Sequence, residues 1–213
     1  MDSALFARCA YEIQSPRLII RTATTEDTEA YYKFLTTPEN FPYEEPEQGL
    51  TLEKLRARIG RLAESTAHGK NAFVIVTLCE TGQLIGHGGY NTFESVDYEQ
   101  FLSLLDTPVG KKYMTDIGIA IAHTHWRKGY GLELLSALVE YAHGELGCEL
   151  FRTETGIDNE PWRSLMRSAQ LERFKGSHKA SYDKNVDVWV WKFDANHWAE
   201  AKAKMKAEGK WYL

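Results

Sequence analysis

Cysteine is scarce in this sequence: Cys9, Cys79 and Cys148 lie far apart, and no C-x-x-C pair occurs. An odd count without close pairs argues against a disulfide framework. A run of about 18 apolar residues is also missing, so no segment is predicted to span a membrane. The N-terminal residues lack the basic and apolar regions of a signal peptide. These absences predict a reduced, soluble, cytoplasmic protein without a membrane partner.

Positive charge is not in excess either. The chain has 25 Lys and Arg residues against 30 Asp and Glu residues, a net charge of −5. It therefore lacks the basic field that holds a phosphate backbone, and nucleic acid is not an expected partner. A mild negative balance is compatible with a cationic amine substrate. The length of 213 residues and the average apolar content of 43% favour one globular domain.

The hydrophobic pattern alternates strands and helices. Strands are expected at 17–22, 71–78, 84–92, 113–121 and 149–155, with a hairpin of 171–179 and 186–193. Helices are expected at 25–35, 51–66, 131–147, 159–169 and 196–208. This order indicates an α/β or α+β fold with a mixed sheet. Residues 15–195 form the expected domain, with an insertion at about 93–112, and residues 196–213 form a C-terminal helix and tail.

The most informative stretch is 116–135, DIGIAIAHTHWRKGYGLELL. A buried strand leads into a loop with Gly129 and Gly131, and an amphipathic helix follows at once. Free amides at the helix start, the helix dipole and close backbone approach at glycine make an anion site suited to a pyrophosphate. The Walker A and dinucleotide fingerprints are both absent. An ordinary strand–helix turn explains the local pattern equally well.

Several segments together resemble the GNAT N-acetyltransferases, in particular the branch of the RimJ/RimL type. Residues 116–121 read DIGIAI where that branch has E-I-G-x-x-I, and residues 126–134 read WRKGYGLEL where it has W-G-K-G-Y-A-T-E-A. Residues 17–21, RLIIR, match its opening R-L-x-L-R strand, and residues 159–161 match its N-E-P helix start. The resemblance covers roughly 15–195.

The resemblance implies a single GNAT-like domain with a mixed, mostly antiparallel sheet that is splayed at an acetyl-CoA site and flanked by helices. The residues implied at that site are Arg127, Lys128, Gly129, Tyr130, Gly131 and Leu132 for the pyrophosphate, Ile119, Ala120 and Ile121 for the pantetheine arm, and Asn159 for the other side of that arm. A plain helix cap is the second interpretation of Asn159. The GNAT family also makes a homodimer possible.

The motifs offer one candidate for the catalytic base. Asp116 aligns with the glutamate that is the general base in related histone acetyltransferases; the other interpretation is a carboxylate that orients the amine or pairs with a neighbour. Met166 stands where many GNAT enzymes have a tyrosine acid, so the acid for the CoA thiolate is not identified. Tyr182 is a further candidate for it. His123 and His125 suggest no third ligand by spacing, so no metal is expected.

The resulting hypothesis is an acetyl-CoA-dependent N-acetyltransferase that acts on a primary amine, with a small-molecule amine preferred to a protein N-terminus. The alternative is a GNAT-like module that binds CoA without efficient transfer. A different acyl-CoA as donor is a third reading. Acceptor recognition is expected from the acidic loop around Glu44–Glu47 and from the insertion at 93–112.

Overall fold

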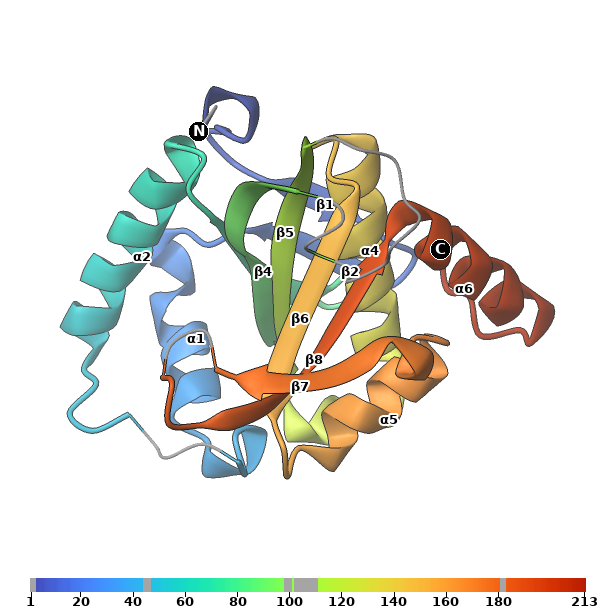
Figure 1. The fold of residues 1–213 in the computed structure, drawn as a ribbon. Helices are drawn as coiled ribbons and strands as arrows, with labels where there is room; N and C mark the ends of the chain where they lie inside the picture. Colours follow the sequence, from blue (N-terminus) through green and yellow to red (C-terminus); the bar gives the residue numbers. More distant parts are fainter. Residues whose placement is uncertain (1–2, 44–46, 98–100, 102–110, 181–182) are drawn as a thin grey trace.

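One sheet organises the computed structural model, which describes residues 3–43, 47–97, 101, 111–180 and 183–213 (Figure 1). In this part of the chain the sheet has eight strands in the order β1-β2-β3-β4-β5-β6-β8-β7. The strands are β1 (Glu12–Gln14), β2 (Leu18–Thr22), β3 (Ala72–Leu78), β4 (Leu84–Asp97), β5 (Lys111–Ile121), β6 (Leu150–Gly156), β7 (Lys175–Lys179) and β8 (Asp187–Asp194). All neighbours are antiparallel except β5 and β6, which are parallel. The predicted mixed, mostly antiparallel sheet is confirmed.

Helices cover the two faces of the sheet unequally. They are α1 (Thr28–Leu35), α2 (Leu52–Ala67), α4 (Tyr130–Gly144), α5 (Glu160–Ser168) and α6 (Ala195–Ala207). The helices α1 and α2 pack on one face of the β2–β4 half through a cluster that includes Phe34, Leu55 and Ile75. The larger core lies on the other face, beneath α4, and α6 joins it through Trp198 and Met205. No helix of the described chain combines the length and hydrophobicity that a bilayer crossing needs.

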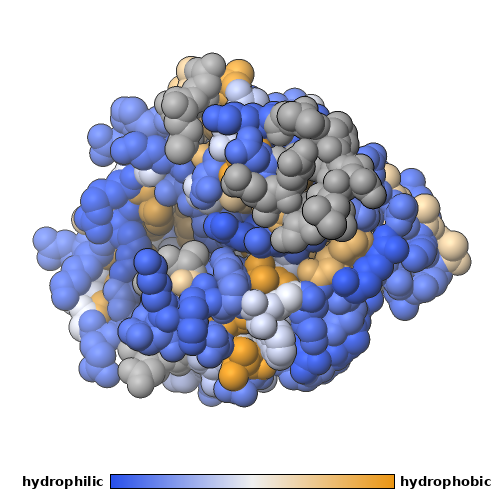
Figure 2. All heavy atoms as spheres, in the orientation of Figure 1, coloured by the Kyte–Doolittle hydropathy of each residue, from blue (hydrophilic) through white to orange (hydrophobic). Residues whose placement is uncertain are grey.

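One region of the sheet is left without a covering helix in the described residues. It is the face of β5, β6, β8 and β7 that lies opposite α4, and we call it the open face. In Figure 1 it is turned toward the viewer, with α4 behind β6 and β8. Phe101 packs on Met114 and Leu150 at one end of it. Figure 2 shows mainly hydrophilic side chains on this side of the molecule, with hydrophobic residues between them.

The sheet opens between β5 and β6. These strands pair only where residues 114–116 meet residues 150–152. Beyond that point β5 continues to Ile121 beside β4 alone, and β6 continues to Gly156 beside β8 alone. The predicted splay is therefore present, and one edge of residues 117–121 has no strand partner in the described structure.

Strands β4 and β5 form a longer hairpin than the sequence pattern predicted. Strand β4 reaches Asp97 instead of Thr92, and β5 starts at Lys111, so that Asp97 faces Lys111 in register. A bulge at Asn91 shifts the alternation of buried and exposed residues by one position, which hides the continuing strand from a period-two pattern. Within the expected insertion, Phe101 is described, whereas residues 98–100 and 102–110 lie outside the described residues.

Gly89 provides a test of the close pairing of β3 and β4. Its φ is +130°, and a Cβ there would lie 1.9 Å from the carbonyl oxygen of Ala72. Gly89→Ala should therefore lower the free energy of unfolding by about 2 kcal/mol or more. Urea denaturation measures this loss.

Gly60→Ala is the matched control. Gly60 lies inside α2, and a Cβ there meets no atom within 4 Å. This variant should gain about 0.5–1 kcal/mol because alanine loses less backbone freedom in a helix. Equal stability of the two variants would contradict the pairing described for Gly89.

Candidate functional site

The loop between β5 and α4 has the form of an anion site. Residues 127–132, which we call the glycine loop, include two left-handed positions, Arg127 at φ +60° and Gly129 at φ +83°. The indole Nε1 of Trp126 donates to the carbonyl oxygen of Ile121 at 2.5 Å and ties the loop to the end of β5. This contact gives a structural reason for tryptophan at that position.

The amides of the glycine loop are free. The first backbone bond of α4 runs from Glu133 N to the Gly129 oxygen at 3.0 Å. Among the described residues, no hydrogen-bond acceptor meets the amides of Arg127, Lys128, Gly129, Tyr130, Gly131 and Leu132. A helix start leaves four amides unpaired in general, and this loop adds two. Six unpaired donors at the positive end of a helix dipole form a strong site for an anionic group.

Arg17 contacts both the glycine loop and the first turn of α4. Its Nε pairs with Glu133 Oε2 at 2.6 Å, and its Nη1 donates to the Lys128 carbonyl oxygen at 3.0 Å. The rings of Tyr130 and Tyr212 each lie 4.5 Å from the guanidinium carbon. The Glu133 side chain is fully buried, so the ion pair with Arg17 offsets its charge. The sequence motifs contained both residues but gave no sign that they meet.

The edge of β5 that faces the opening carries the other residues expected to bind a thioester arm. Ile119 and Ala120 are half-buried, and Ile121 is nearly buried. Asn159 lies at the start of α5 across the opening. Its Oδ1 accepts from Trp162 N at 3.1 Å, and its Nδ2 donates to Thr155 Oγ1 at 2.8 Å. The helix-cap interpretation of Asn159 is thus present, while a ligand contact remains a prediction.

An acidic cluster occupies the open face where β5 and β6 part. Asp116 Oδ2 accepts from Arg152 Nε at 2.6 Å, and its Oδ1 accepts from Asn91 Nδ2 at 2.8 Å. Glu154 Oε1 lies 3.6 Å from Arg152 Nε and 3.2 Å from His178 Nε2. The side chains of Asp116 and Arg152 are only 9% and 20% exposed. Asp116 therefore pairs with a neighbour, as one of its two interpretations stated, and its role as a base remains a prediction.

The charges around Arg152 do not cancel. Burial lowers the pKa of this guanidinium, but the hydrogen bond to Asp116 and the charges of Asp116, Glu154 and Glu94 raise it above its usual value. Three carboxylates thus act on one guanidinium, and one of them, Glu154, also contacts His178. The cluster is therefore suited to attract a cation. The sequence signal for this contact was the presence of one charged residue in each of two apolar strands, Asp116 and Arg152. A buried charge needs a partner, so each of the two residues indicates a nearby partner.

Other candidates from the sequence have structural neighbours or lie outside the described residues. Met166 is fully buried and offers no proton donor. Tyr182 and most of Glu44–Glu47 lie outside the described residues, and Glu47 pairs with Arg58. His123 Nδ1 lies 3.0 Å from Asn40 Oδ1. In the described chain, no three His, Cys, Asp or Glu side chains gather as a metal site.

Removal of Arg152 tests the ion pair. Arg152→Gln leaves the buried Asp116 carboxylate with Asn91 alone and should cost about 3 kcal/mol of unfolding free energy. Lys179→Gln, which breaks the exposed pair with Asp187, should cost less than about 1 kcal/mol. In a double-mutant cycle, adding Asp116→Asn should restore part of the loss. Fully additive losses in urea denaturation would contradict a direct interaction.

Comparison with known proteins identifies the family of this chain. The family model of the "Acetyltransferase (GNAT) domain" matches residues 17–172. The uncharacterized N-acetyltransferase YoaA of Bacillus subtilis (strain 168) is 23% identical over 180 residues, which are 82% of this chain and 93% of that protein.

Solved structures share the fold. Mycobacterium smegmatis RimJ in complex with CoA-disulfide superposes with a TM-score of 0.66 at 13% identity and covers 94% of both chains. RimL, the ribosomal L7/L12 alpha-N-protein acetyltransferase in complex with coenzyme A, has a TM-score of 0.67 at 15% identity; the match covers 88% of this chain and 99% of RimL. At these identities the structures show the fold alone. Because the family model spans most of its length, the chain belongs to the GNAT acetyltransferases.

Proposed function

We propose that this protein transfers the acetyl group of acetyl-CoA to a primary amine. The observation that carries the proposal is the row of six amides in the glycine loop that have no acceptor among the described residues, placed beside an edge of a splayed strand that has no strand partner there. The acidic cluster on the open face lies at the closed end of the same opening. One opening thus has an anion site on one side and a cation-attracting site on the other.

The donor side fits a CoA thioester. The amides of residues 127–132 would hold the pyrophosphate, and the edge of Ile119–Ile121 that has no strand partner in the described structure would pair with the pantetheine arm. Trp162 Nε1, at the start of α5, is buried and has no acceptor among the described residues. When bound, acetyl-CoA supplies an activated acyl group. The chain holds and orients that group and donates hydrogen bonds to it.

The acceptor side fits an amine. The carboxylates of the cluster attract an ammonium group, and an amine must lose a proton before it attacks. Each Asp116 oxygen accepts one hydrogen bond and retains a second lone pair. We propose that Asp116 takes the proton of the amine there, directly or through water, while Arg152 and Asn91 fix its orientation.

A small amine is the preferred acceptor. Phe101 packs on Met114 and Leu150 and bounds the open face beside the cluster. This contact supports a narrow acceptor space. A protein N-terminus is the second candidate, and the likeness to RimL, the ribosomal L7/L12 alpha-N-protein acetyltransferase, supports it.

Acetyl-CoA should raise the melting temperature of the protein, whereas ATP and NAD should not, because only a CoA thioester engages both the glycine loop and the β5 edge. Release of free thiol in the presence of a panel of amines and N-terminal peptides identifies the acceptor class. Asp116→Asn should retain acetyl-CoA binding and lose at least about 100-fold in kcat.

A panel of other acyl-CoAs tests the donor. Faster transfer from a longer acyl chain would replace acetyl-CoA in the proposal. Binding of acetyl-CoA without turnover of any amine would favour the CoA-binding module instead, and full activity of Asp116→Asn would remove it as the base.

Gly129→Ala tests the glycine loop itself. Its φ is +83°, which strains any residue with a Cβ, and a Cβ there would lie 2.4 Å from the hydroxyl oxygen of Tyr212, so the loop or the Tyr212 side chain must shift. The KM for acetyl-CoA should rise about tenfold while the KM of the acceptor stays unchanged. Gly147→Ala is the control, since Gly147 has φ +66° but no atom within 4 Å of a Cβ. A similar rise in both variants would show that general backbone strain, and not the loop, controls acetyl-CoA binding.

A further inference from the structure

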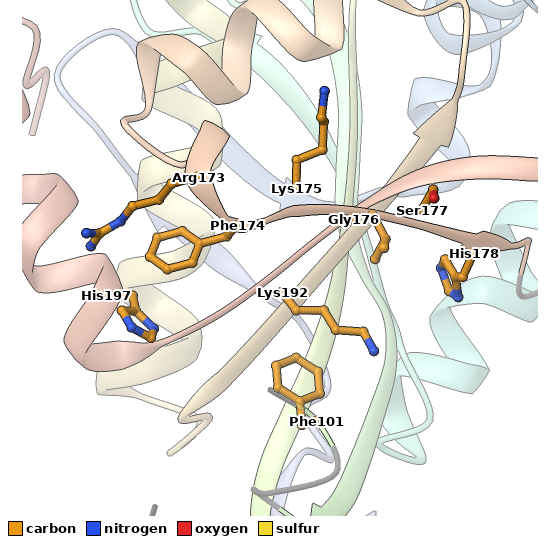
Figure 3. Close-up of a pocket in the computed structure, with 10 residues that line it drawn as sticks. Phe101, Arg173, Phe174, Lys175, Gly176, Ser177, His178, Lys192 and His197 are labelled. Carbon is orange, nitrogen blue, oxygen red and sulfur yellow. The ribbon is translucent and has the colours of Figure 1, made fainter. Parts of the chain in front are cut away.

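A hollow of about 410 Å³ lies on the open face beside the acidic cluster. It is bounded by β7 and β8, by Phe174 and by Phe101, as Figure 3 shows. Lys192 of β8 lies next to the Phe101 ring, with its ammonium 5.6 Å from the ring centre. The hollow therefore combines an aromatic wall with a basic side chain.

Four of the five basic residues around this hollow have a carboxylate partner. Arg173 pairs with Glu200, Lys175 with Glu172, His178 with Glu154, and His197 with Asp194. Lys192 is the exception: among the described residues, no carboxylate lies within ion-pair distance of its ammonium. Within the part of the chain that the structure describes, this ammonium group lies beside an aromatic ring and has no counter-ion, which suits it to bind an anion.

The register of the sheet places Lys192 beside the proposed acceptor site. Lys192 faces Arg152 across β8 and β6, and Arg152 faces Asp116 across β6 and β5. These three residues lie on the same face of the sheet, so Lys192 stands two strands from Asp116, about 10 Å. His178 also links the two places, because it lines the hollow and contacts Glu154 of the acidic cluster.

We propose that Lys192 and the hollow form a subsite for an acidic group of the acceptor. This proposal rests on the proposed acetyl transfer and deepens it by naming the substrate class. The acceptor is an amine that also carries a carboxylate or phosphate several bonds away. Its ammonium lies over Glu94, Asp116 and Glu154, and its acidic group binds Lys192. The apolar atoms between the two groups pack on Phe101.

The charges of the open face carry this assignment. A neutral amine or a polyamine would satisfy the acidic cluster but would leave Lys192 without a counter-ion among the described residues. An acceptor that carries both an ammonium and an acidic group binds the acidic cluster and Lys192 at the same time. The acidic group can belong to a small amine acid or to an acidic side chain near the N-terminus of a peptide. The Lys192 ammonium would bind the acidic group in both cases.

Matched acceptor pairs test the subsite. Glutamate is compared with glutamine, phosphoethanolamine with ethanolamine, and tripeptides with Glu at position two or three with the same peptides carrying Gln. At least one acidic member should have a kcat/KM about tenfold or more above its neutral partner. Which pair shows the preference distinguishes a small amine from a peptide.

Variants of Lys192 assign the preference to this residue. Lys192→Gln should remove the tenfold advantage of the acidic acceptor and leave the neutral partner within about twofold. Lys192→Arg should retain the advantage. Lys204→Gln, on the exposed side of α6, is the control and should change neither member. Equal kcat/KM for both members of every pair in the wild type, or an equal loss for both members in Lys192→Gln, would overturn the subsite.

A second readout separates this proposal from acetyl transfer. If acetyl-CoA binds but no amine is acetylated, the proposed transfer fails, and the subsite is then tested with N-acetylated versions of the same peptides. The acidic peptide should protect Lys192 from an amine-reactive label, measured by mass spectrometry, and the neutral peptide should not. Equal labelling with both peptides would overturn the subsite.

Discussion

The ion pair between Asp116 and Arg152 is the constraint on which this architecture depends. It joins the last register pair of β5 and β6 before the two strands separate. Both side chains are largely buried on the open face, so neither tolerates the loss of the other. The pair thus marks the closed end of the opening. It also holds the carboxylate that the proposed chemistry requires at that position.

Two different electrostatic environments meet around this opening. On the α4 side, six free amides and the helix dipole form a positive site, and Arg17 and Glu133 brace it from behind. On the open face, three carboxylates around Arg152 form a negative site. The pyrophosphate of a CoA thioester fits the positive site, and an amine fits the negative site. The splayed strand lies between the two sites. Lys192 adds a positive position beyond the negative site, which makes the open face dipolar.

The sequence predicted those features that depend on local pattern. The glycine loop, the strand before it and the helix after it follow from residues 116–135. The helix expected at 51–66 is α2, and Thr51 caps it by accepting from Lys54 N at 3.2 Å. The contacts of Arg152, Asn91 and Lys192 could not be predicted, because they join strands that are far apart in the chain. Strand β1 has three residues and is too short for a periodic signal. The bulge at Asn91 interrupts the alternating pattern of β4, so the pattern did not show where the strand ends. The same bulge brings the Asn91 side chain to Asp116.

The most direct measurement is a crystal structure of the protein with coenzyme A. The account predicts that the pyrophosphate binds the amides of residues 127–132 and that the thiol end enters the opening between β5 and β6, next to Asp116. The Asp116–Arg152 pair should remain in place. Coenzyme A bound on another surface, with the glycine loop empty and its amides facing water, would contradict the account.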